Sequence, residues 1–187
     1  MNLCVWEREL NPRLQAYLRV LTHGALLDVD QVVPRGLPSL APLLPELEGR
    51  WAEAFISDLN QNLRIFTAFS EAKEVRVQLH TVDTDQCRLF HVDHLGLRLL
   101  CTYVGPGTEW VGNRDAIRPA LGHCDLGLNN PRVVADPKKV QRLPETAVAL
   151  MKGEKYPGNL GNGLIHRSPP LLEKGLRRLR LIMDAKG

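Results

Sequence analysis

The sequence predicts an α+β fold, in which an N-terminal helical segment packs on an antiparallel β-sandwich or barrel of the jelly-roll kind. Apolar residues recur at helical spacing up to about residue 72, and the period changes to strict alternation from Glu74. The strand-like runs that follow are short and end at Gly, Pro, Asp or Asn turns. No long helices lie between them, as a parallel βαβ sheet would require.

The composition is that of one globular domain. The chain has 187 residues, of which 44% are hydrophobic and 24% are charged, and its formal net charge is +3. Such a small charge does not indicate a nucleic-acid partner. No window approaches the about 20 apolar residues of a membrane span, and the N-terminus does not resemble a signal peptide. Four distant cysteines without a CxxC pair indicate free thiols in a reducing compartment. We therefore expect a single cytoplasmic domain over residues 1–187, without nucleic acid or membrane as partners.

Residues 1–72 are expected to be mainly helical. Asn11 and Pro12 can supply a cap and a first-turn proline, and Gly24 ends this segment. A second helical pattern runs from about Glu48 to Phe69. The apolar residues at helical spacing are Leu14, Tyr17, Leu18 and Leu21 in the first pattern, and Trp51, Phe55, Leu59, Leu63 and Phe66 in the second. We interpret both stripes as core.

The β-sheet part is expected over residues 73–187. Its first run, EVRVQLHTV from Glu74, alternates between apolar and polar residues. Further strand-like runs are Cys87–Asp93, Leu97–Val104, Thr146–Met151, Gly163–Arg167 and Arg177–Asp184. Loop signals dominate residues 105–144, which predicts a long insertion between the middle strands.

Three residues of this part are candidate metal ligands. His91 and Asp93 are two apart in a strand-like run, so their side chains should point to the same face. His166 ends another strand-like run, before a Pro-Pro pair, and is the best candidate for a third ligand. Two imidazoles and one carboxylate leave the other metal positions open, as in the facial triad of non-haem Fe(II) oxygenases. The sequence therefore predicts a divalent metal site on these residues, with Fe(II) as the expected ion.

A second HxD pair, His123 and Asp125, lies in a Gly/Asn-rich stretch without alternation. We interpret it as a loop, with a separate metal ligand as the alternative. Cys101, His123 and Cys124 could supplement a zinc site.

The last strand-like run contains three arginines. Alternation places Arg177 on the same face as Leu179, Leu181 and Met183. If that face points into the barrel, the guanidinium requires an anionic partner, and a ligand carboxylate can serve. The alternative is that Arg177 turns outward to solvent at the end of the strand.

Several motifs together resemble the Fe(II)/2-oxoglutarate-dependent dioxygenase superfamily. GPGTEW (105–110) is similar to the Gly-Gly-Glu-Thr turn of its prolyl-hydroxylase-like members. HRSPPLLEKGLR (166–177) is similar to their stretch from the distal histidine to the basic residue that binds 2-oxoglutarate. More narrowly, the combination of HVDH, TYVGPGTEW, MKGE and HRSPP resembles an uncharacterised bacterial family known only as a domain of unknown function.

The resemblance implies a double-stranded β-helix, which is a jelly-roll or cupin-like fold, with Fe(II) on the three candidate ligands and 2-oxoglutarate as co-substrate. It implies that Arg177 binds the distal carboxylate of the co-substrate and that Tyr103 donates a hydrogen bond near it. Arg178 or Arg180 could take the role of Arg177, because all three crowd one strand.

The Gly-Pro-Gly turn precedes three candidates for the mouth of the pocket, Thr108, Glu109 and Trp110, which could equally form a surface turn. Three glycines at positions 158, 161 and 163 could form a mobile loop beside His166 or a simple connection.

The sequence supports two main hypotheses for the function and a third, weaker one. The first is an Fe(II)/2-oxoglutarate-dependent oxygenase of the hydroxylase type, acting on an unknown small molecule or protein side chain. The alternative is a non-catalytic Zn(II)-binding or metal-homeostasis protein that uses the same pocket, because intrinsic affinity favours zinc over Fe(II). A blander third reading is a degenerate β-helix that serves as a protein-interaction module. The sequence does not indicate an oligomeric state.

Overall fold

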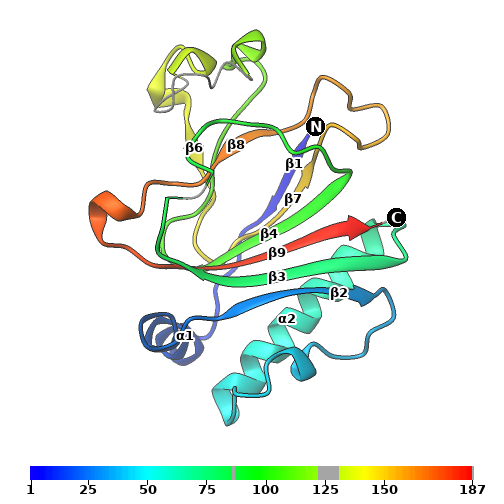
Figure 1. Cartoon of the computed structure of the whole chain (residues 1–187), viewed down its shortest axis with the longest axis vertical. Coiled ribbons are helices and arrows are strands. Elements are labelled where there is room, and N and C mark those ends of the chain that lie inside the picture. The colour runs from blue at the N-terminus through cyan, green and yellow to red at the C-terminus, as the bar shows by residue number, and fades with distance from the viewer. Residues whose placement is uncertain (86, 122–130, 187) are drawn as a thin grey trace.

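Two antiparallel β-sheets form the body of the protein, as the computed structural model shows (Figure 1). The structure describes residues 1–85, 87–121 and 131–186. The larger sheet has the strand order β1 (Leu3–Trp6), β7 (Val148–Lys152), β4 (Leu97–Val104), β9 (Arg178–Lys186), β3 (Glu74–Val82) and β2 (Asp28–Pro34). The smaller sheet has the order β6 (Gln141–Arg142), β5 (Glu109–Val111) and β8 (Ile165–Arg167). An isolated antiparallel bridge between His91 and His166 adds one more segment beside β8.

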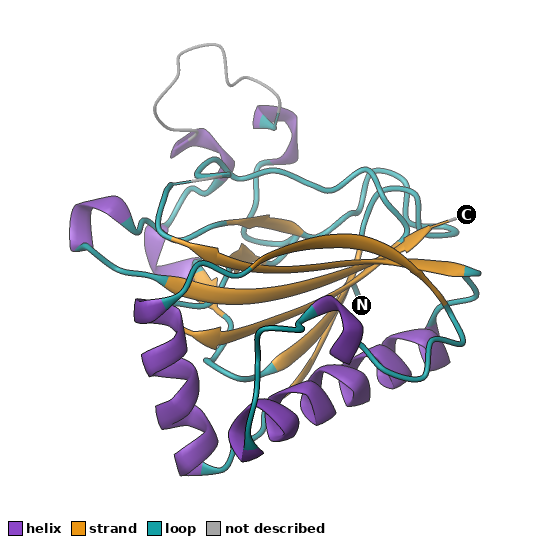
Figure 2. Ribbon diagram, turned by 60° about the horizontal axis from the view of Figure 1, so that its bottom comes forward, coloured by secondary structure: helices purple, strands orange, loops and turns teal. Residues whose placement is uncertain are grey.

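Two α-helices cover one face of the larger sheet, and the smaller sheet lies on its other side (Figure 2). Helix α1 spans Pro12–Gly24, and the side chain of Asn11 caps it by accepting a hydrogen bond from the backbone N–H of Arg13 at 2.9 Å. Helix α2 spans Arg50–Phe69 and follows Gly49, whose φ is +89°. Short 3-10 helices occupy connections at Ala41–Leu43, Arg118–Ala120, Pro131–Val133, Pro137–Lys139 and Leu172–Lys174. In the described part of the chain, no helix is long and apolar enough to cross a membrane.

The main core lies between the helices and the larger sheet. The apolar stripes that the sequence predicted on both helices are confirmed as core, since Leu18, Phe55 and Phe66 are fully buried. They pack on alternate residues of the three central strands, namely Val75, Val77 and Leu79, then Leu99, Cys101 and Tyr103, and then Leu179, Leu181 and Met183. Removal of these side chains from water supplies most of the free energy that drives this packing.

The orientation of β9 corrects one expectation. The face that carries Leu179, Leu181 and Met183 was expected to point into the barrel, but it packs on the helices. The opposite face, with Arg180 and Ile182, lines the space between the two sheets. Alternation shows that a strand has two faces, but a separate apolar layer, here the helices, decides which face it covers.

The strand positions mostly follow the alternation pattern. The runs from Glu74 and from Leu97 form β3 and β4, and three later runs form β7, β8 and β9 with ends shifted by one or two residues. The run Cys87–Asp93 contributes only the bridge at His91. Strands β1 and β2 lie in the part that was expected to be mainly helical, and β2 pairs along its whole length with β3. The insertion contains β5 and β6.

Candidate metal centre

The side chains of His91, Asp93 and His166 converge at the side of the smaller sheet that faces the larger one. One donor atom of each lies within 4.8 Å of the other two. Nε2 of His166 is 3.3 Å from Oδ2 of Asp93, and Nε2 of His91 is 3.9 Å from Oδ1. The backbones of the two histidines hold each other through two N–H···O hydrogen bonds of 3.0 Å. The fold thus brings together three residues that are distant in the sequence.

Both histidines are held in the orientation that a metal ligand requires. Nδ1 of His91 lies 2.8 Å from the carbonyl oxygen of Leu89, and Nδ1 of His166 lies 3.0 Å from that of Leu164. A carbonyl oxygen only accepts hydrogen bonds, so each Nδ1 must carry the proton. A ring held in this way presents the lone pair of Nε2 towards Asp93 whenever it is neutral, which is the usual arrangement of a histidine that binds a metal through Nε2.

This donor set fits a divalent cation. Two imidazole lone pairs that face a carboxylate repel it unless a positive charge lies between them. An ion held at about 2.1 Å from each donor would set neighbouring donors roughly 3 Å apart, which requires side-chain adjustments of about 1–2 Å. Three protein ligands on one side leave further positions open to a co-substrate, as in non-haem iron sites.

Arg98 and Asp184 support the carboxylate of Asp93. The guanidinium of Arg98 donates from Nη1 to Oδ2 of Asp93 at 2.5 Å, and from Nε and Nη2 to both oxygens of Asp184 at 2.7 and 2.8 Å. Burial opposes the ionisation of Asp93, but His166, Arg98 and His91 outweigh it and lower the pKa of Asp93 to about 2. Burial and the charge of His166 lower the pKa of His91. Asp93 is therefore ionised and His91 neutral at neutral pH, and both are ready to bind a metal.

Gly153, in the MKGE motif, positions the backbone of Asp93. A Cβ atom at Gly153 would lie 2.7 Å from the carbonyl oxygen of Asp93 and 2.3 Å from that of Leu95. The next residue, Glu154, donates its backbone N–H to the same carbonyl of Asp93 at 2.9 Å. Only a residue without a side chain allows this close approach.

A cavity of about 240 Å³ adjoins the three donors, between the two sheets. Besides the donors, its lining includes Leu100, Thr108, Arg180 and Ile182. Arg180 forms no ion pair or side-chain hydrogen bond with any residue that the structure describes. Burial lowers the pKa of Arg180, and the charge of Arg98 adds to this effect against the opposing influence of Cys87 and Asp184. A largely buried guanidinium is costly without an anion, so the lining of this cavity suits an anionic ligand.

Arg178 lies on the same face of β9 and is only 1% exposed. Its Nη2 donates to Oγ1 of Thr102 at 2.8 Å and to Oγ1 of Thr108 at 2.6 Å. Within residues 1–85, 87–121 and 131–186, no carboxylate pairs with it. Burial and the neighbouring Arg180 lower the pKa of Arg178 to about 9. The strand that forms one wall of the cavity thus carries two positive groups that have no acidic partner in the described part of the chain.

The structure corrects the expectation for Arg177. This residue precedes β9, and its guanidinium donates to the carbonyl oxygen of His23 at 2.8 Å and to that of Thr22 at 3.5 Å. These carbonyls belong to the last turn of α1, where backbone acceptors lack helical partners and attract basic side chains. Arg177 therefore serves the helix end and does not line the cavity, whereas Arg180 does.

The expectation for Tyr103 is also wrong. Tyr103 is fully buried on the helix-facing side of β4, where its ring packs edge-on against Phe55. Its hydroxyl donates to Oδ2 of Asp58 at 2.6 Å and accepts from Nδ2 of Asn62 at 2.9 Å. The sheet separates it from the three donors, because alternation along β4 places it with the helices.

The structure places the three candidates for the mouth of the pocket in three different surroundings. Thr108 lines the cavity. Glu109 is buried and accepts from Arg142 at 2.5 Å and from Arg167 at 2.8 Å, so it ties β5 to both neighbouring strands. Trp110 lines a second and larger cavity.

The additional zinc ligands that were considered do not join the three donors. Cys101 is fully buried on the helix side of β4, beside Arg8. His123, Cys124 and Asp125 lie outside the described residues.

Sequence reasoning missed the roles of Arg98, Asp184 and Glu154, and it placed Arg180 only as an alternative. Glu154 is buried and accepts from the backbone of Gly161 at 2.5 Å and of Gly163 at 2.9 Å, so it anchors the glycine-rich loop before His166. The alternating positions of Arg98 and Asp184 in their strands were the signal that could have paired them.

Comparisons with known proteins show a similar fold and a family. A dioxygenase for auxin oxidation in rice superposes with a TM-score of 0.55 at 10% identity, over 99% of this chain and 73% of that chain. A Pseudomonas putida prolyl-4-hydroxylase superposes with a TM-score of 0.46 at 11% identity, over 100% of this chain and 94% of that chain. No curated protein matches the sequence. The family described as "Protein of unknown function (DUF1826)" matches residues 1–184, and the chain therefore belongs to that family.

Proposed function

We propose that the protein is a non-haem Fe(II)- and 2-oxoglutarate-dependent oxygenase of the hydroxylase type. The observation that carries this proposal is the joint arrangement of a two-histidine, one-aspartate donor set and a cavity lined by Arg180, which has no anionic partner among the described residues. A metal site alone does not require a buried cation beside it. A site for a metal-chelating dicarboxylate does require such a cation, because the second carboxylate needs a positive partner.

We also infer that the two sheets form a double-stranded β-helix. The support is the path of the chain, which alternates between the sheets from β3 to the His91 bridge, to β4, to β5 and β6, to β7, to β8 and to β9. Among the described residues, this path produces two facing antiparallel sheets, one of four strands once β1 and β2 are set aside as additions at its edges, and one of three strands with the His91 bridge beside them. The likeness to the rice dioxygenase agrees with this inference at the level of the fold.

We assign roles to five side chains that line the cavity. His91, Asp93 and His166 hold the iron, and Arg98 keeps Asp93 ionised and fixes its orientation. Arg180 binds the carboxylate of the co-substrate that lies away from the metal.

The remaining wall residues support this arrangement. Thr108 lines the cavity, and Arg178 places positive charge directly behind its hydroxyl. Leu100 and Ile182 exclude water from the space between the metal ligands and Arg180.

Fe(II) with bound 2-oxoglutarate supplies activation of O2, with decarboxylation of the co-substrate to succinate and hydroxylation of a substrate. The protein contributes the open positions on the metal and a dry, positively charged cavity. We place this activity in the cytoplasm, in keeping with the free thiols of Cys4, Cys87 and Cys101.

The test is anaerobic addition of Fe(II) and 2-oxoglutarate to the purified protein, followed by visible absorption spectroscopy. We expect the weak charge-transfer band of an iron–keto-acid chelate, and we expect it to disappear in His166→Ala. Arg180→Met should require much more 2-oxoglutarate to reach the same band. Arg177→Met is the matched control and should behave as the unchanged protein, since the guanidinium of Arg177 donates to the carbonyl oxygens at the end of α1 and does not line the cavity.

The same experiment separates the proposal from its alternative, a non-catalytic Zn(II)-binding or metal-homeostasis protein. Tightly bound zinc after purification, with no band and no binding of 2-oxoglutarate after exchange for Fe(II), would favour the alternative. A band that is unaffected by His166→Ala would contradict both.

A further inference from the structure

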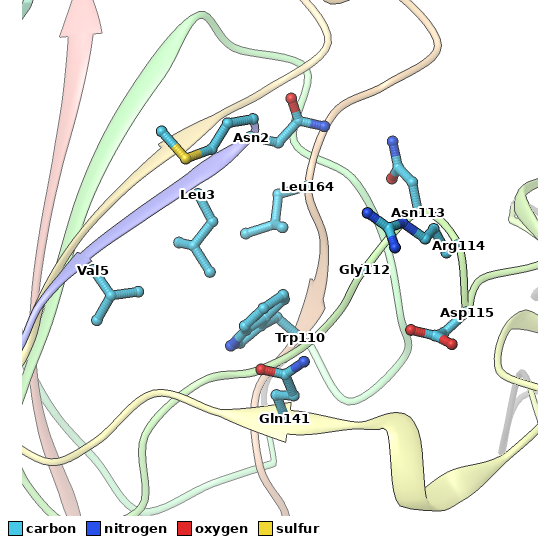
Figure 3. A pocket seen from close by; sticks show the side chains of 11 residues that line it. Asn2, Leu3, Val5, Trp110, Gly112, Asn113, Arg114, Asp115, Gln141 and Leu164 are labelled. Carbon is cyan, nitrogen blue, oxygen red and sulfur yellow. The ribbon is translucent and has the colours of Figure 1, made fainter.

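A second cavity, of about 630 Å³, opens beside the candidate metal centre. It lies between β1, at the edge of the larger sheet, and the strands β5 and β6 of the smaller sheet. Leu3 and Val5 of β1 face Trp110 and Leu164 across it (Figure 3). Its volume is in the range of about 300–1,000 Å³ that is usual for small-molecule sites.

The apolar part of this cavity reaches the metal ligands. Trp110 lies directly opposite His166 in the pairing of β5 with β8, so the two side chains share one face. Leu164 precedes His166 by two residues, and its carbonyl oxygen accepts the Nδ1 proton of that histidine. Leu164 also lines a narrow crevice that contains Asp93 and His166. An apolar group on Trp110 and Leu164 would therefore lie next to the metal.

The far end of the cavity is polar. Asn113, Arg114 and Asp115 follow β5 and lie at the other end of the cavity from Leu3 and Val5 (Figure 3). Asn113 is fixed by Arg118, which donates to its Oδ1 at 2.8 Å. Arg114 and Asp115 form no ion pair with each other, and neither side chain has an ionic or hydrogen-bonding partner among the residues that the structure describes. Two opposite charges thus remain available at one end of an apolar cavity.

We propose that this cavity binds the primary substrate, and that the substrate is an amino acid or short peptide with an apolar side chain. Its carboxylate would pair with Arg114 and its ammonium group with Asp115, while the apolar side chain would lie on Trp110 and Leu164. The binding site stands on the geometry of the cavity alone, whereas its role as a substrate site rests on the proposed oxygenase function. This orientation would bring the apolar side chain, rather than the charged end, to the wall of the cavity that Trp110 and Leu164 form beside His166.

The experiment is isothermal titration calorimetry of the whole metal-free protein with the dipeptide Leu-Phe and two matched probes. N-acetyl-Leu-Phe lacks the ammonium group, and the amide of Leu-Phe lacks the carboxylate. We expect the free dipeptide to bind most tightly. Each probe should bind about fivefold more weakly, because ion pairs at an exposed rim contribute modestly.

Variants of the residues that line the cavity test each proposed contact separately. Arg114→Gln should make the free dipeptide and its amide bind equally, and Asp115→Asn should do the same for the free and the acetylated dipeptide. Trp110→Ala should weaken all three probes by about thirtyfold or more, as for a buried aromatic anchor. Trp6→Ala is the matched control, because Trp6 lies on β1 but is 47% exposed and lines neither cavity.

The outcomes separate this inference from the proposed function. Equal binding of all three probes, no binding of any, or equal effects of the Trp110 and Trp6 variants would overturn the substrate class. Charge-selective dipeptide binding in a protein that forms no iron–keto-acid band would support the cavity and contradict the oxygenase. The band without dipeptide binding would contradict only the substrate class.

Discussion

Replacement of Arg178 by methionine should make the metal-free protein more stable and its co-substrate binding weaker. Arg178 is 1% exposed, and burial with the neighbouring Arg180 lowers its pKa from the ordinary value of an arginine to about 9. A fall of that size corresponds to an upper bound of about 5 kcal/mol against the charged form in the folded state. Arg178→Met removes this cost but leaves the hydroxyls of Thr102 and Thr108 without their donor, which costs about 1–3 kcal/mol.

The net expectation is a gain of about 1–3 kcal/mol in the free energy of unfolding. For a chain of this size, that gain corresponds to a rise in Tm of roughly 3–10 °C. Thermal and urea unfolding of the metal-free protein measure the gain. The rise in Tm that Fe(II) and 2-oxoglutarate produce together should become smaller in the variant, because a ligand stabilises the folded state according to its affinity.

Arg177→Met is the control, since its guanidinium is partly exposed and caps α1. It should change neither the effect of the ligands nor the stability by more than about 1 kcal/mol. Loss of stability in Arg178→Met would refute the reasoning, because it would show that the hydrogen bonds to the two threonines outweigh the cost of the buried charge.

Three further predictions test the site and its surroundings. Arg98→Met should weaken metal binding about 10–100-fold, as measured by competition with a chelator, because Asp93 loses the group that orients it. The free energy of unfolding of the metal-free protein should decrease as the pH falls through 6.5. Burial and His166 lower the pKa of His91 in the folded protein, so the imidazole binds a proton at a higher pH in the unfolded chain. His91→Gln should remove this part of the pH dependence of urea unfolding. Tyr103→Phe should destabilise the protein by about 1–2 kcal/mol through the lost hydrogen bond to Asp58, yet leave the affinity for 2-oxoglutarate unchanged; a weakened affinity would restore Tyr103 to the site.

The sequence indicated the three metal-ligand candidates because local spacing carries their signal. His91 and Asp93 share a strand face by their separation alone, and His166 stands at the end of a strand-like run. The bridge between the two histidines is a tertiary contact, which the local spacing did not predict. The structure brings these three side chains together.

The errors over Arg177 and Tyr103 have a common physical cause. Alternation divides the residues of β4 and β9 into two faces, but both faces of the larger sheet are covered, one by helices and one by the smaller sheet. The more apolar face was assigned to the interior of the barrel, whereas it packs on α1 and α2. Only knowledge of where the helices lie could have moved the choice from Arg177 to Arg180.

Strands β1 and β2 were missed for a different reason. Each is an edge strand with many exposed residues, and β2 ends at Pro34, so neither shows the pattern of a buried strand. Their stability comes from pairing with β7 and β3, which are far away in the sequence. Propensity over a short window contains no information on such partners.

The paired peptide groups of His91 and His166 would fix the separation of the two histidine ligands in the proposed metal site through the main chain. Substitution of either histidine would change the donor atom. The backbone hydrogen bonds of 3.0 Å would still fix the distance between the two positions in the chain. In the proposed metal site, exchange of one ion for another would therefore require side-chain movements but no change in strand register. The identity of the ion would then depend on metal supply and on the chemistry of the donor side chains.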